Sequence, residues 1–357
     1  MILCADARHI PLKDKSVQCC VTSPPYFNLR DYQTAKWVGG DSTCDHRHQL
    51  GGEGTSSAKQ NTSKGTQTLQ YRHVCGKCGA VRHDLQLGME LTIDDYVANI
   101  VVVCREVRRV LKDSGLLWIN LGDSFAANRS YQVTDNKHVG VGNIQSSSVP
   151  VGLKPKDLIG MPWAVAFALR DDGWWLRSDI VWNKLNPMPE SITDRPTRSH
   201  EYIFLMSKSA KYFYDYKAIK EPAVNDGKIV RCGANSHADN DRVPGGNKKQ
   251  DMLGKQTYTV FNDRWANKPC DGRNKRSVWN IATQPYSGSH FATFPEEIPR
   301  TCILAGSRPG DVILDPFGGS GTTAKVAIEL GRKPIHLDLT YFDLAKKRTS
   351  TTMGFGV

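Results

Sequence analysis

Two short segments at opposite ends of the chain carry residue types that could do chemistry together. Near the start, Thr22-Ser23-Pro24-Pro25-Tyr26 offers a polar acceptor, a stiff pair of prolines and an aromatic ring. Near the end, Asp315-Pro316-Phe317-Gly318-Gly319-Ser320-Gly321-Thr322 follows an apolar run and precedes a helical pattern. Glycines in such a turn let a ligand approach the backbone, and the amide groups at the start of a helix are free to bind it. The second segment therefore predicts a nucleoside-binding turn, and the first predicts a polar site beside an aromatic face.

The surroundings of the glycine-rich turn narrow what it could bind. Asp338 ends the next apolar run, 17 residues after Gly321, which is where a ribose-binding acid belongs in a nucleotide-binding fold. A phosphate-binding P-loop is disfavoured because no Gly-Lys-Ser/Thr ends the motif. Ordinary dinucleotide binding is less favoured because Asp315-Pro316-Phe317 replaces the usual first glycine. A tight turn capped by Ser320, with no ligand, is the plain alternative.

In this order, the two segments resemble the beta class of DNA amino-methyltransferases, which modify adenine N6 or cytosine N4 and carry the catalytic segment first. The resemblance extends over residues 22–32, 105–123, 153–163 and 179–214. It departs from the expected pattern at Phe27-Asn28, where Trp-Gly would stand, and this difference could alter the base pocket. The resemblance implies an α/β fold, a Rossmann-like methyltransferase sheet, with S-adenosyl-L-methionine as the cofactor.

The resemblance also implies roles for single residues. Asp315 would take the amino group of the cofactor, Asp338 would take its ribose hydroxyls, and Asp6 would lie near its adenine. Asp6 could equally be a turn residue or a helix cap. Residues 290–295 would contact the methionine end of the cofactor. The implied cofactor-binding residues are Asp6, Ala292, Phe294, Pro295, Asp315, Phe317, Gly318, Gly319, Ser320, Gly321, Thr322 and Asp338.

Methyl transfer to an exocyclic amine accounts for the residues of the first segment. The lone pair of this nitrogen is delocalised into the aromatic ring, so acceptors that bind the amine protons make it a better nucleophile. Ser23 Oγ and the carbonyl of Pro24 can be those acceptors, because Pro24 and Pro25 fix the backbone. Tyr26 offers a face on which a base flipped out of the duplex can stack. We expect Ser23, Pro24, Pro25 and Tyr26 to be catalytic, and no strong general base is required because the proton can leave to water.

Cysteines and histidines gather in a stretch without periodicity, residues 43–88. Cys44-x-His46 is followed by Cys75-x-x-Cys78-Gly79, and two such pairs fit a tetrahedral structural zinc. The alternatives are unrelated cysteines in a mobile insertion and, less favoured, a redox Cys-x-x-Cys. The predicted zinc ligands are Cys44, His46, Cys75 and Cys78, with His48 competing with His46 and with His73 and His83 as outside candidates.

The charge of the chain points to a polyanionic partner. The 47 basic and 36 acidic residues give a net charge of +11. Residues 217–276 alone hold 13 Lys or Arg against 7 Asp or Glu, with aromatic residues interleaved. We expect double-stranded DNA as the partner. The expected parts are the catalytic part of the methyltransferase domain at 1–43 and 89–216, a zinc-binding insertion at 44–88, a target recognition domain at 217–285 and the S-adenosylmethionine-binding part at 286–357.

Hydrophobic periodicity predicts the elements that position these segments. We expect two strands around a turn within residues 1–21, the second of them at 17–21, and further strands at 115–121, 174–182, 200–207, 312–314 and 335–337. We expect helices at 93–111, capped by Thr92, and at 162–171, 322–330 and 342–348. The order strand, turn, helix, strand near the end predicts a largely parallel sheet. Residues 124–152 show no regular pattern, which is typical of a functional lid or of disorder.

Composition limits the classes of function. No apolar run approaches the roughly 18 residues that span a bilayer, and the start carries no secretory signal. The mostly scattered cysteines fit a reducing compartment, so we expect the cytoplasm of a bacterium or of a phage-infected host. The leading function is a site-specific DNA methyltransferase of a restriction-modification system or a phage. The alternatives are an RNA or protein-side-chain methyltransferase and an inactive zinc-containing nucleic-acid binder, and a homodimer stays open.

The target base is not fixed by the motif. A serine at the first catalytic position is commonest in cytosine-N4 enzymes of the family, whereas aspartate is commonest in adenine-N6 enzymes. The phage-like relatives that this chain resembles include adenine enzymes with Ser-Pro-Pro-Tyr. Adenine N6 is therefore slightly favoured over cytosine N4.

Overall fold

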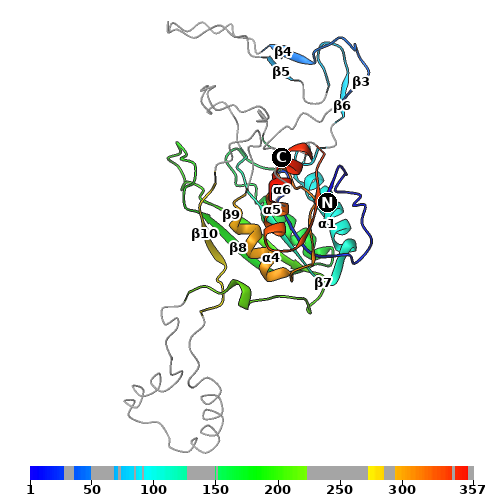
Figure 1. Ribbon diagram of the computed structural model, residues 1–357. Helices are drawn as coiled ribbons and strands as arrows, with labels where there is room; N and C mark the ends of the chain where they lie inside the picture. The colour runs from blue at the N-terminus through cyan, green and yellow to red at the C-terminus, as the bar shows by residue number, and fades with distance from the viewer. Residues whose placement is uncertain are drawn as a thin grey trace, which may run out of the picture.

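The apolar strands of the chain form one eight-stranded sheet at the centre of the computed structural model (Figure 1). The structure describes residues 1–27, 36–49, 68–70, 74–83, 86–90, 92–126, 149, 152–222, 272–284, 294–339 and 342–352. The strand order is β1-β12-β11-β2-β7-β9-β8-β10. The strands are β1 (Ile2–Leu3), β2 (Val17–Thr22), β7 (Leu111–Leu121), β8 (Trp175–Lys184), β9 (His200–Ser207), β10 (Val278–Ile281), β11 (Val312–Asp315) and β12 (Lys333–Leu337).

The sheet is largely parallel, as predicted, with one reversed strand. β9 runs antiparallel to both of its neighbours, β7 and β8, and all other neighbouring strands are parallel. The amino end of β9 therefore lies at the edge where the parallel strands finish. In the register, Glu201 of β9 is opposite Trp182 of β8, and Ile203 is opposite Asn120 of β7. This reversal brings the start of β9 to the edge that carries Ser23.

Helices cover both faces of the sheet. One core includes residues of α1 (Ile93–Val110) and α2 (Met161–Asp171), and the other includes residues of α4 (Glu297–Gly306) and α5 (Thr322–Glu329). Neighbouring strand residues alternate between the two cores, with Cys20 in the first and Cys19 in the second. Burial on both faces explains why the central strands read as continuous apolar runs. A short 3-10 helix, η3 (Lys217–Ile219), and the helix α6 (Phe342–Thr352) complete the set of described helices.

The start of α1 follows its sequence signals. Thr92 caps the helix, because its hydroxyl oxygen accepts a hydrogen bond of 3.1 Å from the amide of Asp95. Acidic residues in the first turn, and Arg108 and Arg109 in the last, complement the helix dipole. The other predicted strands and helices are confirmed with shifted ends; β7, for example, already begins at Leu111.

Of the strands in the central sheet and the α-helices, β10 and α4 were not predicted. The strand β10 lies inside the range 217–285 that the sequence assigns to target recognition, yet it pairs with β8 in the central sheet. Residues 223–271 of that range, and 127–148 of the predicted lid, lie outside the described residues. The described end of the recognition range is therefore part of the same sheet as the catalytic segment.

Two short ribbons lie apart from the central sheet (Figure 1). β3 (Lys36–Val38) pairs with β6 (Val81–His83), and β4 (Arg47–Gln49) pairs with β5 (Thr68–Gln70), both antiparallel. β3 precedes the range 44–88 that the sequence reads as an insertion, and β4, β5 and β6 lie within it; none of these four strands was predicted. In the described part of the chain, no helix combines the length and the apolar character that crossing a membrane requires.

Candidate active site

The two segments that the sequence singles out meet at the carboxyl edge of the sheet. β2 and β11 are parallel neighbours, with Cys20 opposite Leu314. The residues that follow these positions are therefore also close: the hydroxyl of Thr22 donates a hydrogen bond of 2.7 Å to Asp315 Oδ1, across 293 residues of sequence. Carboxyl edges at such points are where ligands bind in open α/β sheets. The contact places the Ser23 segment beside the glycine-rich turn.

Ser23 and Tyr26 belong to a network of polar side chains. The Ser23 hydroxyl donates to the Tyr26 hydroxyl at 3.3 Å, and the Tyr26 hydroxyl donates to Glu201 Oε2 at 2.7 Å. Asn120 Nδ2 donates to the Tyr26 hydroxyl at 2.8 Å and to Glu201 Oε2 at 2.9 Å. Lys184 Nζ donates to Glu201 Oε1 at 2.5 Å. The network joins the ends of β2, β7 and β8 to the start of β9.

The sequence did not identify Asn120, Lys184 and Glu201 as site residues. Their signal in the sequence was weak: Asn120 is the one polar residue in the apolar run 116–121 of β7, and Glu201 is the second residue of β9. Asn120 is 3% exposed, and its Oδ1 has no hydrogen-bond donor among the residues that the structure describes. A buried acceptor without a donor lowers the stability of the fold. Its presence here indicates that these residues serve a function rather than stability.

The backbone of the catalytic segment is held tightly. The hydroxyl of Tyr96, a fully buried residue of α1, donates a hydrogen bond of 2.9 Å to the carbonyl of Pro25. A side chain at Gly122 would lie 2.5 Å from Tyr26 Cε2, and one at Gly88 would lie 2.7 Å from the Tyr26 carbonyl. Burial, together with the charge of Glu201, raises the pKa of Tyr26 well above its ordinary value, so the phenol stays protonated. Tyr26 is therefore a fixed hydrogen-bond donor.

The glycine-rich turn has the backbone that its sequence predicts. Gly319 and Gly321 adopt φ values of +50° and +83°, in the left-handed region that side chains disfavour. Asp338 accepts a hydrogen bond of 2.9 Å from the amide of Gly319, which joins β12 to the turn. Gly318 packs directly on the imidazole of His336, where a Cβ would collide with the ring. A side chain at Gly318 would therefore push the turn away from His336.

Several residues predicted to bind the cofactor have partners within the protein. Arg348 Nη1 of α6 donates to Ser320 Oγ at 3.0 Å and to Thr322 Oγ1 at 3.1 Å. Arg348 Nη2 also donates to Glu296 Oε1 at 2.9 Å, just before α4. The hydroxyls of Ser320 and Thr322 are thus bound by α6, on the protein side of the turn. Phe317 is half-buried next to them and donates its amide to Asp315 Oδ1 at 3.1 Å.

The buried acid and the buried histidine of the turn influence each other. Asp315 is 2% exposed, and burial raises its pKa, although the hydrogen bonds from Thr22 and from the amide of Phe317 favour the charged form. His336 is fully buried, and burial lowers its pKa against the attraction of Asp315 and Asp338. Neither ring nitrogen of His336 has a hydrogen-bond partner among the described residues. The floor of the turn therefore holds a neutral imidazole.

Of the remaining residues that were predicted to bind the cofactor, the structure describes three. Asp6 follows β1 and accepts hydrogen bonds from the amide and guanidinium of Arg8. Burial disfavours the charged form of Asp6, but the hydrogen bonds from Arg8 hold its pKa below the ordinary value. Phe294 and Pro295 lead into α4, and Phe294 packs on the core of that face. Ala292 lies outside the described residues.

The four predicted zinc ligands come together near the β3–β6 ribbon. The ligand atoms of Cys44, His46, Cys75 and Cys78 all lie within 4.8 Å of one another. The sulfurs of Cys44 and Cys75 are 3.8 Å apart, and Cys78 Sγ is 3.5 Å from His46 Nδ1. The ring of His46 stacks on Trp37, with 4.3 Å between the ring centroids. His48, the competing candidate, and His73 have no described side chain.

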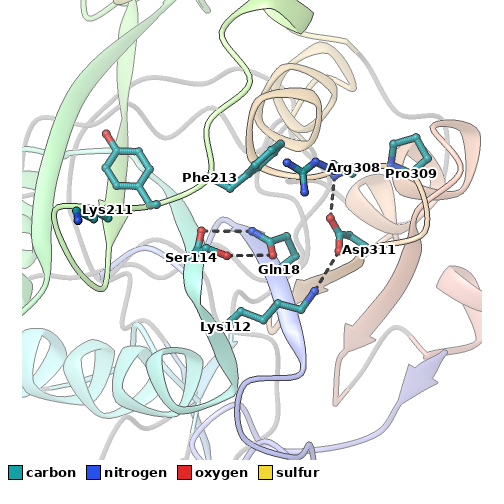
Figure 2. A pocket seen from close by; sticks show the side chains of 9 residues that line it. Gln18, Lys112, Ser114, Lys211, Phe213, Arg308, Pro309 and Asp311 are labelled. Atoms are coloured by element: carbon teal, nitrogen blue, oxygen red, sulfur yellow. Dashed lines mark hydrogen bonds and ion pairs between the residues drawn. The ribbon is translucent and has the colours of Figure 1, made fainter.

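A separate cavity of 640 Å³ opens at the opposite, amino edge of the sheet (Figure 2). Asp311 accepts hydrogen bonds there from Lys112 Nζ at 3.1 Å and from the amide of Arg308 at 2.9 Å. The guanidinium of Arg308 lies 4.4 Å from the ring centroid of Phe213. The cavity holds none of the residues that the sequence singles out for chemistry. Its lining residues are Gln18, Lys112, Ser114, Lys211, Tyr212, Phe213, Arg308, Pro309 and Asp311.

Comparisons with known proteins agree with the geometry of the carboxyl edge. Residues 17–347 match the model of the DNA methylase family for N6 and N4 methylation. The chain is 41% identical to the Type II methyltransferase M.SmaI of Serratia marcescens, over 97% of this chain and 89% of that protein. It is 37% identical to the Type II methyltransferase M.Cfr9I of Citrobacter freundii, over 94% of this chain and 82% of that protein.

Solved structures share the fold. The cytosine-N4-specific PvuII DNA methyltransferase aligns with a TM-score of 0.53 and 15% identity, over 97% of this chain and 85% of that chain. A putative DNA modification methylase of Thermus thermophilus, complexed with S-adenosyl-L-methionine, aligns with a TM-score of 0.50 and 20% identity, over 98% of this chain and 93% of that chain. Together with the family match, the joined catalytic and cofactor segments lead to one conclusion: the chain belongs to the DNA methylase family and is an amino-methyltransferase of the N6/N4 type.

Proposed function

We propose that this chain transfers a methyl group from S-adenosyl-L-methionine to the exocyclic amine of a base flipped out of double-stranded DNA. The observation that carries the proposal is the hydrogen bond between Thr22 and Asp315, which joins the catalytic segment to the cofactor turn. Direct transfer requires the acceptor amine and the methyl donor to lie side by side, and adjoining segments provide that arrangement. Residues 1–27 and the strands β7, β8 and β9 would form the catalytic part.

The cofactor site proposed for this chain is the turn 318–322 with the acids at the ends of β11 and β12. The turn fits a nucleoside because its glycines adopt left-handed backbone conformations without side chains, and because its helix N-terminus offers amide groups. When bound, S-adenosyl-L-methionine supplies an activated methyl group on a sulfonium. Asp338 would take the ribose hydroxyls, Asp315 the amino group, and Asp6 would lie near the adenine.

The proposed acceptors of the amine protons are Ser23 Oγ and the carbonyl of Pro24. Their support is the rigidity of the segment, which Tyr96 and the close approach of Gly88 hold in place. Acceptors that are fixed before the reaction cost no reorganisation when charge develops on the amine. The ring of Tyr26, half-buried at this edge, would carry the stacked base.

For the target base we propose cytosine N4, with adenine N6 as the alternative. The slight preference for adenine depended on phage-like relatives that combine Ser-Pro-Pro-Tyr with adenine methylation. The similar proteins found are Type II methyltransferases of Serratia marcescens and Citrobacter freundii, so that argument loses weight. The serine at position 23 then favours cytosine, because a serine there is commonest in the cytosine-N4 enzymes of the family.

The experiment is methylation of unmethylated duplex DNA by the purified chain, followed by digestion to nucleosides and mass spectrometry. We expect N4-methyldeoxycytidine, and N6-methyldeoxyadenosine would instead support the alternative base. RNA of the same sequence is the matched control substrate. Methylated RNA with unmethylated DNA would contradict the proposed substrate, and no product from either would favour the inactive nucleic-acid binder.

The recognition of DNA is proposed for the basic segment before β10. Its support is the net charge of +6 over residues 217–276, from 13 basic and 7 acidic residues. Each phosphate contact that is lost should reduce the salt slope of binding by about one. Lys248→Ala combined with Lys249→Ala should therefore flatten the dependence of DNA affinity on salt. Lys211→Ala, at the cavity on the amino edge, is the control, and an unchanged slope in the double variant would move the DNA surface elsewhere.

We also propose that Cys44, His46, Cys75 and Cys78 hold one structural zinc ion. A tetrahedral ion at about 2.3 Å from sulfur and about 2.0 Å from nitrogen requires ligand atoms about 3.8 Å apart for two sulfurs and about 3.5 Å apart for sulfur and nitrogen. The distances of 3.8 Å and 3.5 Å match these two values. Backbone amides, that of Ala80 first, lower the pKa of Cys78 to about 6, which favours the thiolate that zinc needs.

The zinc proposal is tested by elemental analysis of the purified chain. We expect about one zinc per chain, and Cys75→Ser should lose it and make residues 44–88 sensitive to protease, because such sites fold their own module. Cys104→Ser, at a buried cysteine of α1, is the control that should keep the metal. A zinc content near zero in the unchanged chain would refute the site.

A further inference from the structure

A directed chain of hydrogen bonds leads from Ser23 to Glu201. The Tyr26 hydroxyl has one hydrogen, and the short distance of 2.7 Å to Glu201 Oε2 assigns that hydrogen to the carboxylate. The Tyr26 oxygen can then accept from others, and it receives the Ser23 hydroxyl at 3.3 Å. Ser23 therefore uses its only hydrogen toward Tyr26, and its lone pairs are left to accept the protons of an amine.

Asn120 reinforces this direction. Its amide nitrogen has two hydrogens, and the two short contacts, 2.8 Å to the Tyr26 hydroxyl and 2.9 Å to Glu201 Oε2, use both. The contact from the same nitrogen to Ser23 Oγ is longer, 3.4 Å. Rotating the amide would place its oxygen against the Glu201 carboxylate, which is unfavourable. Asn120 thus donates to the end of the hydrogen-bond chain at Tyr26 and Glu201, and it leaves the lone pairs of Ser23 Oγ largely unoccupied.

Glu201 is held as a charged acceptor at the end of the chain. Its side chain is 13% exposed, and it accepts hydrogen bonds from Lys184, Asn120 and Tyr26. Other charged groups near it are His200, whose pKa burial lowers, and the pair formed by Arg198 and Asp123. Asp123 does not compete as an acceptor for Ser23, because its carboxylate takes the amide of Met161 and faces Arg198.

We propose that Glu201 is the terminal proton acceptor of the reaction, reached from the target amine through Ser23 and Tyr26, and that Lys184 and Asn120 are its positioning residues. The inference rests on the proposed methyl transfer to an exocyclic amine. It replaces the expectation that the departing proton needs no group of the protein. A chain of hydrogen bonds that ends on a carboxylate also polarises its members, which makes Ser23 Oγ a stronger acceptor before transfer.

The proposed step balances. The amine nitrogen forms a bond to the methyl carbon while the bond between that carbon and sulfur breaks, and the electron pair of the broken bond stays on sulfur. The nitrogen then carries a positive charge and gives one proton to Ser23 Oγ. The Ser23 hydroxyl gives its proton to the Tyr26 oxygen, and the Tyr26 hydroxyl gives its proton to Glu201. The products are a neutral methylated amine and a neutral Glu201 carboxylic acid, which later loses its proton to water.

The experiment compares Glu201→Gln, Tyr26→Phe and their combination in single-turnover methylation of DNA with saturating S-adenosyl-L-methionine. Removing proton transfer typically costs 10²- to 10⁴-fold, so we expect each single variant to lose about 10²-fold or more in rate. Tyr26→Phe keeps the aromatic ring and the ion pair of Glu201 with Lys184. The double variant should be no slower than the slower single variant, because both interrupt the same path.

The pH profile separates a proton acceptor from a structural residue. A group that accepts the proton of the reaction makes the rate depend on pH, so the single-turnover rate of the unchanged enzyme should fall at acid pH, and this fall should disappear in Glu201→Gln. Cofactor affinity and the urea midpoint are measured on each variant to show that it is folded. Glu329→Gln is the matched control, because Glu329 pairs with Arg300 and Lys325 between α4 and α5, away from the site.

Two results would overturn the inference. One is a folded Glu201→Gln variant whose rate stays within about threefold of the unchanged enzyme. The other is a slow Glu201→Gln variant that keeps the acid fall of the unchanged enzyme, which would make Glu201 a structural residue only. If Glu201→Gln does not fold, Tyr26→Phe decides, because a rate and pH profile like those of the unchanged enzyme rule out the path. An unchanged enzyme that methylates no DNA would contradict the proposed function itself.

Discussion

Thr22→Val tests the contact that joins the two halves of the active site. Valine has nearly the shape of threonine but lacks the hydroxyl that donates to Asp315 Oδ1 at 2.7 Å. Hydrogen bonds to charged groups contribute about 1.5–3 kcal/mol, and a buried carboxylate that loses one of its donors keeps the cost of desolvation. We therefore expect the free energy of unfolding to fall by about 1.5–3 kcal/mol at neutral pH. Thr22→Ser, which keeps the hydroxyl, should lose much less.

The loss in free energy of unfolding caused by Thr22→Val should depend on pH. Burial raises the pKa of Asp315 in the folded protein, so the folded state binds this proton more tightly than the unfolded chain does. The contribution of Asp315 to stability is then greatest below its unfolded pKa of about 3.9 and is lost as pH rises through the raised folded pKa. Removing the hydroxyl of Thr22 raises the folded pKa further. The loss in free energy of unfolding should therefore be largest above the raised pKa of Asp315 and smaller at acid pH.

Urea denaturation of the three chains at several pH values measures this effect. The urea midpoints of the variants should differ at neutral pH, while the dependence of the unfolding free energy on urea concentration stays unchanged. The midpoints should approach one another as the pH is lowered. A Thr22→Val chain within about 0.5 kcal/mol of the unchanged protein at neutral pH would refute the reasoning, as would a deficit that is constant with pH.

Three further predictions follow from the described contacts. Gly318→Ala should abolish binding of S-adenosyl-L-methionine in calorimetry because its Cβ would collide with the ring of His336, and adding His336→Ala should restore part of the affinity. Ser23→Ala should slow single-turnover methylation by about 10²- to 10³-fold at nearly constant cofactor affinity, and Asp338→Ala should instead weaken the cofactor; the reverse pattern would exchange their roles. Thr92→Ala should lower the free energy of unfolding by about 1 kcal/mol through loss of the α1 cap, whereas Thr92→Ser should not.

The sequence predicts the elements that are defined by their own residues. β2, β9 and β11 are apolar runs, and α1 has a capping residue and helical periodicity, so local physics locates them. β10 is a strand of only four residues after a basic stretch, and it becomes a strand by pairing with β8. α4 carries Pro299 in its first turn, directly after a segment that we interpreted only as a cofactor contact. β10 was missed because it depends on a distant partner, and α4 was missed because its first residues were read as part of the preceding loop.

Residues of the candidate active site could likewise be predicted only where they belong to a contiguous motif. Ser23, Tyr26, Asp315 and the glycine-rich turn are contiguous motifs and could be identified one segment at a time. Lys184, Asn120 and Glu201 come from three different strands, and their meeting depends on the reversal of β9. No local pattern contains the order of strands in a sheet. The cluster of Cys44, His46, Cys75 and Cys78, proposed to hold zinc, could be predicted from its spacing, and the structure brings the four ligand atoms together.

The strand order β1-β12-β11-β2 has a consequence for synthesis on the ribosome. β1 and β2 are made well before β12 and β11, which pair with them. Pairings across such sequence separations form slowly, because a long loop must close first. Until residues 312–337 have emerged, β1 has no neighbour in the sheet and one edge of β2 stays open. Until then the glycine-rich turn cannot assemble beside the Ser23 segment, and the strands made earlier carry unpaired edges that are prone to aggregation.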